Sequence, residues 1–300
     1  MDGKDVVLEK RRNPFCSVPE IRKGSQPTDG GNLLVDAEER SALMQVEPEA
    51  AAWMRPLMGS EEFINGNNRW CLWLKDCRPD ILRKMPEVVK RIEAVRKMRL
   101  ASTKAATRTW AGSPTVFTED RQPASKYLLV PSVSSELRPY MPIGFMSDEV
   151  IVSNLAFAIP EATLFHFGVL SSTMHMAWMR TVCGRLKSDY SYSNTVVYNN
   201  FPWPENPTDK HKQAIEAAAQ SVLAARSQFP ESSLADLYDP LTMPPVLLKA
   251  HQTLDRAVDA AYGRRDFKSE AERVAFLFEL YQYFIDQLPA PRAKRSPVGA

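Results

Sequence analysis

The sequence predicts an α+β fold, in which a mixed domain with a small sheet and helices precedes an all-helical C-terminal domain. Short β-rich runs punctuated by proline and glycine fill residues 126–160, and after Pro207 the composition shifts to Ala, Gln, Glu and Leu at helical spacing. The 300 residues give room for two domains, and a hydrophobic content of 44% is enough for a buried core.

The chain divides into four parts. Residues 1–31 are polar and turn-rich and are predicted to be a connector. Residues 32–204 are assigned to the mixed domain and residues 205–290 to the helical domain. Residues 291–300 contain proline and basic residues and are predicted to be a tail.

The mixed domain begins with a predicted strand at Leu33–Val35. A helix follows, capped by Asp36 and running to about Met54, because an acidic N-cap precedes a Glu-rich segment. Over Arg69–Leu74 tryptophan and leucine alternate with other residues, several of them also apolar. This pattern predicts a strand that is covered on both faces.

A basic amphipathic helix is predicted within Ile81–Met98. Its apolar residues recur at spacings of three and four, and it starts near Met85 because the proline that follows fits only a first turn. Residues 69–108 hold twelve Lys and Arg against four Asp and Glu, a balance of +8 in a chain whose formal net charge is +2. Two interpretations stay open: a solvated helix face, or a surface for a polyanion.

The β-rich part predicts a small sheet, with strands in Tyr127–Val130, Met141–Phe145 and Val150–Ile159. Helical spacing over Ala162–Val182 predicts one helix that stops at Gly184, a residue type favoured just past a helix end. Three further helices are expected at about 208–228, 244–262 and 268–287.

No convincing catalytic constellation appears in the sequence. It contains no nucleophile elbow, P-loop, zinc-protease motif or glycine-rich nucleotide turn. The cysteines are predicted to be reduced and buried, because they are widely spaced and lie near no paired histidines: Cys16, Cys71, Cys77 and Cys183. We therefore expect no metal, no cofactor and no catalysis by this chain alone.

Two observations concern the compartment. The charge-free run between Glu161 and Arg180 holds too many Ser, Thr and His residues to span a bilayer and is predicted to be buried, so no membrane partner is expected. The first twelve residues carry seven charges and no apolar segment. The cytoplasm is the expected location.

The segment after Gly184 is the most suggestive for binding. In an extended strand Lys187, Asp189 and Ser191 would share one face. Lys187 and Asp189 could form a surface ion pair of little consequence. Alternatively, they could read a base pair, with Lys187 donating to guanine and Asp189 accepting from cytosine N4.

Several motifs, in one order, resemble those of the MmeI-like proteins, which are bacterial restriction-modification enzymes and DNA adenine methyltransferases. The resemblance covers nearly the whole chain and includes Pro27-Thr28-Asp29-Gly30-Gly31-Asn32-Leu33, Gly59-Ser60-Glu61-Glu62-Phe63-Ile64-Asn65-Gly66, Val130-Pro131-Ser132-Val133-Ser134-Ser135-Glu136, His175-Met176-Ala177-Trp178 and Phe201-Pro202-Trp203-Pro204. It implies that this chain is the target-recognition region and the helical C-terminal end of such a protein. The parent protein would be an adenine-N6 DNA methyltransferase or a type IIG restriction-modification protein.

The resemblance implies that this chain reads double-stranded DNA for a methyltransferase domain of the same parent protein. That domain, with its S-adenosylmethionine, is expected upstream and is absent here. Whether the parent also cleaves DNA stays open. An intact enzyme is disfavoured by the missing nucleotide motifs.

The resemblance also implies where DNA is contacted. The implied base-reading positions are Ser132, Asn154, Leu155, Lys187, Asp189 and Ser191. Candidates for phosphate contacts are Arg180, Arg185, Lys90, Arg91 and Lys97. The alternative is a helical protein-interaction or structural module without DNA readout, which salt would distinguish, because only phosphate contacts weaken steeply with ionic strength.

Overall fold

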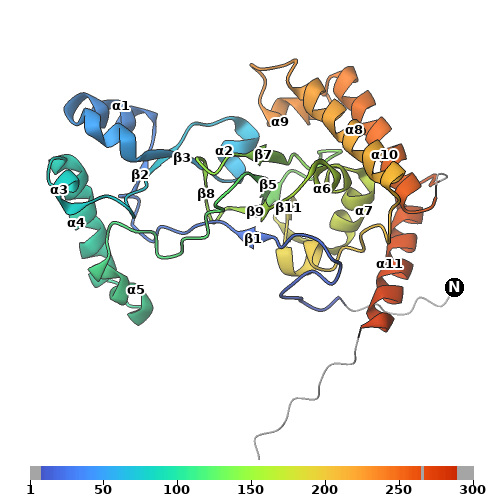
Figure 1. Cartoon of the computed structure of the whole chain (residues 1–300), viewed down its shortest axis with the longest axis horizontal. Coiled ribbons are helices and arrows are strands. Elements are labelled where there is room, and N and C mark those ends of the chain that lie inside the picture. The colour runs from blue at the N-terminus through green and yellow to red at the C-terminus, as the bar shows by residue number, and fades with distance from the viewer. Residues whose placement is uncertain (1–7, 265–266, 289–300) are drawn as a thin grey trace, which may run out of the picture.

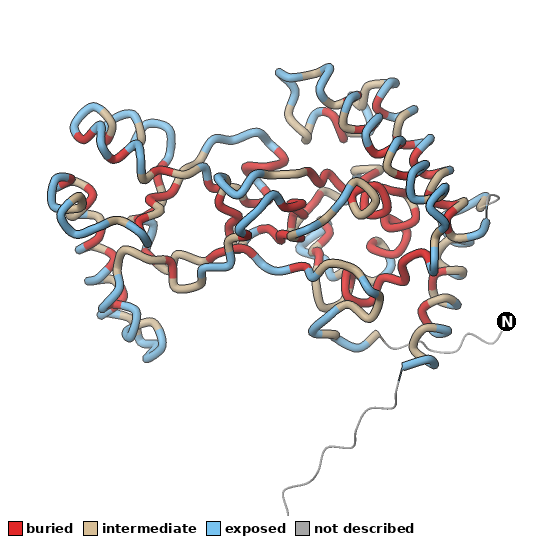
Figure 2. The backbone as a smooth tube through the Cα atoms, viewed as in Figure 1, coloured by how far each residue is buried: buried red, intermediate tan, exposed pale blue. Residues whose placement is uncertain are grey.

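A computed structural model describes residues 8–264 and 267–288. The molecule is elongated, with α1, α3, α4 and α5 at one end, the long helices α8, α10 and α11 at the other, and most of the strands between them (Figure 1). Buried residues run through the central strands and the inward faces of the helices, whereas the outer turns are exposed (Figure 2). The predicted α+β class is confirmed.

The N-terminal lobe is built on a sheet in the order β2-β4-β3-β8. It consists of β2 (Leu34–Val35), β4 (Trp70–Leu72), β3 (Met54–Met58) and β8 (Ile151–Val152), and only the β3–β8 pair is parallel. Asp36 caps α1 (Ala37–Val46) in a capping box with Glu39, as the sequence predicts.

The prediction that this helix runs to Met54 is wrong. A 3₁₀ helix, Pro48–Trp53, follows α1, and Met54 already opens β3. Pro48 lacks the backbone N–H that a continuing α-helix needs, and the residue before a proline disfavours the α conformation. The strand pairing of β3 with β4 then takes over where helix was expected.

The predicted basic helix is confirmed as α4 (Pro86–Leu100), with Met85 as its N-cap residue. Two short helices flank it, α3 (Pro79–Leu82) and α5 (Ala105–Thr109). The backbone N–H groups of Glu87 and Val88 lie in the first turn of α4 and have no partner within the helix. They donate to the buried carboxylate of Glu47, which lies at the end of α1. An anion at a helix N-terminus satisfies these donors and complements the helix dipole.

Arg99, near the end of α4, is fully buried, and all five of its N–H donors are used. Nε donates to Thr28 O at 2.9 Å, one terminal nitrogen to Trp110 O and Ser113 O, and the other to Pro27 O and Val116 O, at 2.8–3.0 Å. A guanidinium is costly to bury unless every donor is satisfied. Arg99 therefore joins three chain segments at the base of the lobe.

The central sheet has the order β1-β9-β5-β7 and is antiparallel throughout. Its strands are β1 (Arg22–Lys23), β9 (Ala156–Pro160), β5 (Tyr127–Pro131) and β7 (Gly144–Met146). Every residue of β5 is buried. A smaller sheet, in the order β10-β11-β6, holds β10 (Gly184–Leu186), β11 (Asp189–Ser191) and β6 (Val133–Ser134).

Two helices replace the single helix predicted over Ala162–Val182. They are α6 (Leu164–Leu170) and α7 (Thr173–Val182), and Ser172 caps α7 by accepting from the backbone N–H of His175. Gly184 is not a cap either, because Cys183 ends α7 in an extended conformation and Gly184 opens β10. After β11 the chain forms a π-helical turn at Asn194–Tyr198.

The three predicted C-terminal helices are confirmed as α8 (Asp209–Arg226), α10 (Pro245–Ala261) and α11 (Glu270–Gln287), with a short α9 (Leu234–Leu237) between the first two. They share one hydrophobic core with α6, α7 and the central sheet. Trp178 of α7, for example, packs its ring against Phe278 and Tyr281 of α11. The core therefore crosses residue 205, and the domain boundaries remain a prediction.

Of the residues expected as a connector, 8–23 lie along the body formed by the central sheet and the C-terminal helices, and Pro27 and Thr28 reach Arg99 in the N-terminal lobe. Ile21 is buried, and the amides of Asn199 and Asn200 donate to the carbonyls of Arg11 and Glu9. The tail expected at 291–300 lies outside the described residues. No helix in residues 8–264 or 267–288 is long and apolar enough to cross a bilayer.

His175 gives the body a dependence on pH. Its side chain is 1% exposed, and burial lowers its pKa to about 3, below the ordinary value of 6.5. Between pH 3 and 6.5 the unfolded chain therefore binds a proton at His175 that the folded chain does not bind. The contribution of His175 to the free energy of unfolding is fully present above pH 6.5 and is lost as the pH falls. Burial raises the pKa of Asp255 to about 6, so this group alone would make the fold more stable as the pH falls. Burial lowers the pKa of His166 to about 4, which adds to the effect of His175.

We expect the free energy of unfolding to decrease between pH 7 and pH 5, and His175→Gln to flatten the slope by up to about 1.4 kcal/mol per pH unit. Gln does not titrate and keeps a polar group near the Tyr192 hydroxyl, which lies 3.1 Å from Nε2 of His175. Urea titrations at pH 5, 6 and 7, followed by tryptophan fluorescence, measure this. An unchanged slope in the variant would contradict the assignment.

Candidate nucleic-acid interface

A groove of about 380 Å³ opens beside α2 (Ser60–Asn65), where the chain segments around Ser132, Leu155 and Asp189 come together. One wall comes from α2 and the other from residues 132–135 and Arg138, and Leu155 and Asp189 complete the lining. The lining contains hydroxyl, carboxylate, amide and guanidinium groups, which are the groups that bond base edges and phosphates.

Ser60 holds the floor of this groove together. Its hydroxyl lies 2.5 Å from the carbonyl oxygen of Leu155, to which it donates, and it accepts from the backbone N–H of Ser132 at 2.8 Å. The Ser132 hydroxyl donates to the same Leu155 carbonyl at 2.5 Å. The backbone at Leu155 is thereby anchored, and its side chain remains 53% exposed.

Helix α2 is itself held at both ends. The carboxylate of Glu62, which is 8% exposed, accepts from the backbone N–H of Gly59 at 3.0 Å and from Arg69 at 3.3 Å. Gly66 ends the helix in the left-handed conformation, at φ 73°, which suits glycine. Glu61 and Asn65 of this short helix line the groove.

The β10–β11 hairpin forms the far side of the site. Leu186 pairs with Asp189, so Lys187 and Ser188 are the two residues of the turn. Asp189 and Ser191 lie on one face of β11, opposite the buried Tyr190, as the alternation predicts. Lys187 does not share their strand geometry: its φ of 57° places it in the turn, exposed at the hairpin tip.

Arg185 and Arg180 brace this region through contacts with other residues of the chain. Arg185 donates to Glu136 at 3.1 Å and to Ser188 O at 2.8 Å, and its guanidinium lies 4.1 Å from the centre of the Tyr190 ring. Arg180 contacts Glu270 at 2.5 Å and the carbonyl oxygen of Arg138 at 3.2 Å. Both sequence-predicted phosphate contacts thus already have protein partners.

The structure brings three of the six implied base-reading residues, Ser132, Leu155 and Asp189, into one groove. Asn154 precedes Leu155 and is tied through its backbone N–H to Ser25 O at 2.9 Å. Ser191 and Lys187 lie beside the groove on the hairpin. Sequence reasoning missed six polar lining residues, namely Ser60, Glu61, Asn65, Ser134, Ser135 and Arg138.

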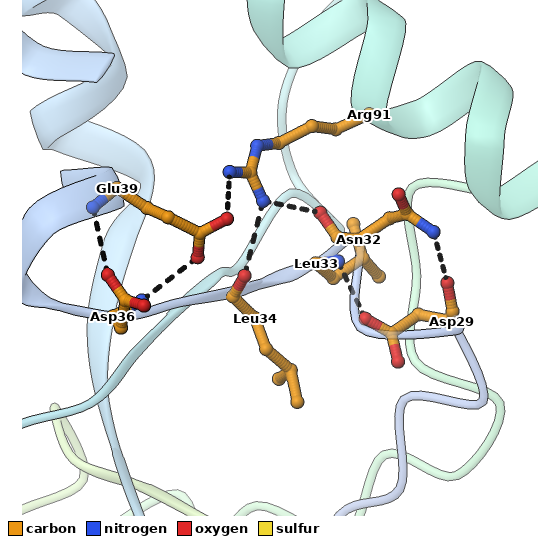
Figure 3. A network of polar contacts seen from close by, with 7 residues as sticks. All are labelled: Asp29, Asn32, Leu33, Leu34, Asp36, Glu39 and Arg91. Atoms are coloured by element: carbon orange, nitrogen blue, oxygen red, sulfur yellow. Dashed lines mark hydrogen bonds and ion pairs between the residues drawn. The ribbon is translucent and has the colours of Figure 1, made fainter. Parts of the chain in front are cut away.

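The basic helix α4 lies in the other lobe. Arg91 reaches from α4 to Glu39 at 2.7 Å and to the carbonyl oxygens of Leu34 and Asn32, so its donors brace α4 against α1 (Figure 3). Lys90 contacts Glu87 of its own helix at 2.6 Å, and Lys97 is exposed. Of these three candidates, Arg91 is the one already engaged in holding the fold.

The cysteines are free thiols, and Cys71 is buried while the other three are partly buried. Burial raises the pKa of the Cys16 thiol to about 11. Among residues 8–264 and 267–288, no group of three His, Cys, Asp or Glu side chains is placed to hold a metal ion.

Comparisons with known proteins find similarity to one family over nearly the whole chain. Residues 2–205 match the family model described as MmeI, target recognition domain, and residues 207–289 match MmeI, C-terminal domain. DNA methyltransferase A of Bacillus subtilis (strain 168) is 38% identical over 281 residues, which are 94% of this chain and 32% of that protein.

A solved structure of the type IIL restriction-modification enzyme MmeI in complex with DNA superposes with a TM-score of 0.92 at 48% identity. The match covers 95% of this chain and 38% of that one. The chain therefore spans about a third of the length of these relatives.

Proposed function

The chain belongs to the MmeI family, and from this premise we propose that it is the sequence-specific double-stranded DNA recognition module of a longer restriction-modification protein. The similarity to a protein solved with DNA bound supports this proposal over the whole chain. The module performs no chemistry alone. It positions DNA for catalytic parts that belong to the rest of the longer protein.

The observation that carries the proposal is the groove beside the β10–β11 hairpin. Three separate segments of the chain bring Ser132, Leu155 and Asp189 to it, and the exposed hairpin tip lies beside them. The major groove of B-DNA admits a two-stranded β-ribbon and presents a distinct donor and acceptor pattern for each base pair. A short ribbon with polar groups on one face and an anchored floor behind it suits that task.

The parent protein is proposed to be an adenine-N6 DNA methyltransferase, and its methyltransferase domain would be the partner of this module. The relative named DNA methyltransferase A supports the reaction class. S-adenosylmethionine would bind in that domain, and a target adenine would be flipped out of the duplex into it. Lys187, Asp189, Ser191, Ser132, Asn154 and Leu155 are the proposed base-reading positions.

We expect wild-type protein to bind duplex DNA with a steep salt dependence, and Lys187→Ala/Asp189→Ala to change the preference at one base pair. A good bidentate contact contributes about 1 to 3 kcal/mol of discrimination, whereas nonspecific affinity comes from phosphate contacts elsewhere. Fluorescence anisotropy with a pool of duplex oligonucleotides at two salt concentrations measures both quantities.

The matched control is Asp209→Ala/Lys212→Ala, which removes an exposed cation and anion at the start of α8, outside the groove lining. It should leave the preference unchanged. Binding that is insensitive to salt would support the protein-interaction alternative. Loss of all DNA binding in the groove variant alone would indicate a folding role for that pair.

A further inference from the structure

Arg138 is held firmly by its backbone and loosely by its side chain. Its backbone N–H donates to Ser135 O at 3.3 Å, and its carbonyl oxygen accepts from Arg180 at 3.2 Å. The guanidinium, which lines the groove, makes one long bond, 3.3 Å to the hydroxyl of the buried Ser134. Its Nε is shielded from solvent and has no hydrogen-bond partner among the described residues.

Two other partly buried arginines in the same body, Arg226 and Arg273, are engaged with strong partners. Arg226 donates to the Tyr238 hydroxyl and to Ile143 O at 2.6 Å, and Arg273 contacts Asp259 at 2.5 Å. In contrast, Arg138 has no carboxylate within 4.0 Å among residues 8–264 and 267–288. A guanidinium with unused donors in a partly dehydrated site is costly unless a ligand completes it.

We propose that Arg138 is a further base-reading residue of the recognition module. Two N–H groups of its guanidinium donate to O6 and N7 of a guanine, while the Asp189 carboxylate accepts from the amino group of the paired cytosine. This inference rests on the proposed function. Arg is the side chain whose rigid, planar donors match paired acceptors of this kind, and a carboxylate is the acceptor that suits cytosine N4.

The position of Asp189 supports the pairing. It lines the same groove as Arg138, on the face of β11 that Ser191 shares. Burial lowers the pKa of Arg138, and Asp189 and Asp239 act in the opposite direction. Asp189 is therefore near enough to influence the guanidinium electrostatically without forming an ion pair that would occupy its donors. One donor group and one acceptor group thus face the same space.

The test uses the full chain. A preferred duplex is first selected by wild-type protein from a randomised pool, and Arg138→Lys, Arg138→Met and Asp189→Asn are then measured on it and on all single base-pair variants by anisotropy at several salt concentrations. We expect Arg138→Met to lose about 5- to 150-fold of the preference at one G·C pair, with unchanged affinity for unrelated duplexes, and Arg138→Lys to lose less, because lysine can also donate to guanine. Asp189→Asn should affect the same base pair.

Arg22→Met is the control, because Arg22 is exposed on β1, outside the groove lining, and its side chain forms an exposed ion pair with Glu20. Uniform weakening on all duplexes in Arg138→Met, with the salt slope reduced by about one, would mean a phosphate contact and would overturn guanine reading. An unchanged preference in Arg138→Met would also overturn it while leaving the proposed function intact. Wild-type protein that binds no duplex would overturn both. Thermal unfolding of each variant distinguishes lost contact from lost fold.

Discussion

Replacing Arg99 by methionine is expected to destabilise the N-terminal lobe by about 4 kcal/mol, one of the largest effects of any single substitution in this chain. Methionine fills a similar volume but leaves five carbonyl oxygens, from residues 27, 28, 110, 113 and 116, without their donor. Arg99→Lys keeps the charge, yet its three donors can serve at most three of the five. It should fall between wild type and Arg99→Met.

Urea unfolding followed by tryptophan fluorescence measures the loss, and amide hydrogen exchange locates it. Because the lobe has a core separate from that of the helical body, exchange should accelerate in residues 27–117 and less in α8 and α10. Arg96→Met is the matched control: Arg96 lies on the same helix, exposed and 3.9 Å from Glu93, and should change stability by less than about 0.5 kcal/mol. Equal stability of the two variants would refute the role of Arg99.

The behaviour of Arg99 marks the limit of what local sequence patterns predict. Asp36, α4 and the three long C-terminal helices were predictable, because caps and apolar spacing are encoded within a single segment. In the sequence, Arg99 is one of twelve basic residues in a charged stretch. Its burial depends on carbonyls that lie up to 72 residues away along the chain. Such non-local pairing leaves no periodic signal.

The contrast between local and non-local signals also explains which sequence predictions were wrong. Ser171 and Ser172 divide α6 from α7 because Ser172 can cap a new helix, but two serines in an apolar run are also compatible with one continuous helix. In the groove, the family resemblance predicted the location of Ser132, Leu155 and Asp189. It did not predict Ser60 or Arg138, because α2 is only six residues long and meets the strand ends through tertiary contacts.

Replacing Gly24 by alanine is expected to destabilise the protein by about 2 to 3 kcal/mol and to abolish its DNA preference. A Cβ atom at Gly24 would lie 2.3 Å from Ser153 O and 2.5 Å from Val152 O, and neither backbone carbonyl can rotate away as a side chain would. The segment after β1 would have to separate from residues 152–156. Urea unfolding and anisotropy on the selected duplex measure the two effects.

The two effects are coupled because this contact supports the groove. Gly24 N–H donates to Ala156 O at 3.0 Å, and Asn154 N–H donates to Ser25 O at 2.9 Å, so a shift of β1 displaces the backbone of Asn154 and Leu155. The Leu155 carbonyl in turn anchors Ser60 and Ser132. Gly112→Ala is the control, since nothing lies within 4 Å of a Cβ there and stability should hardly change. If Gly24→Ala unfolds at the same urea concentration as Gly112→Ala, the close approach does not support the groove in this way.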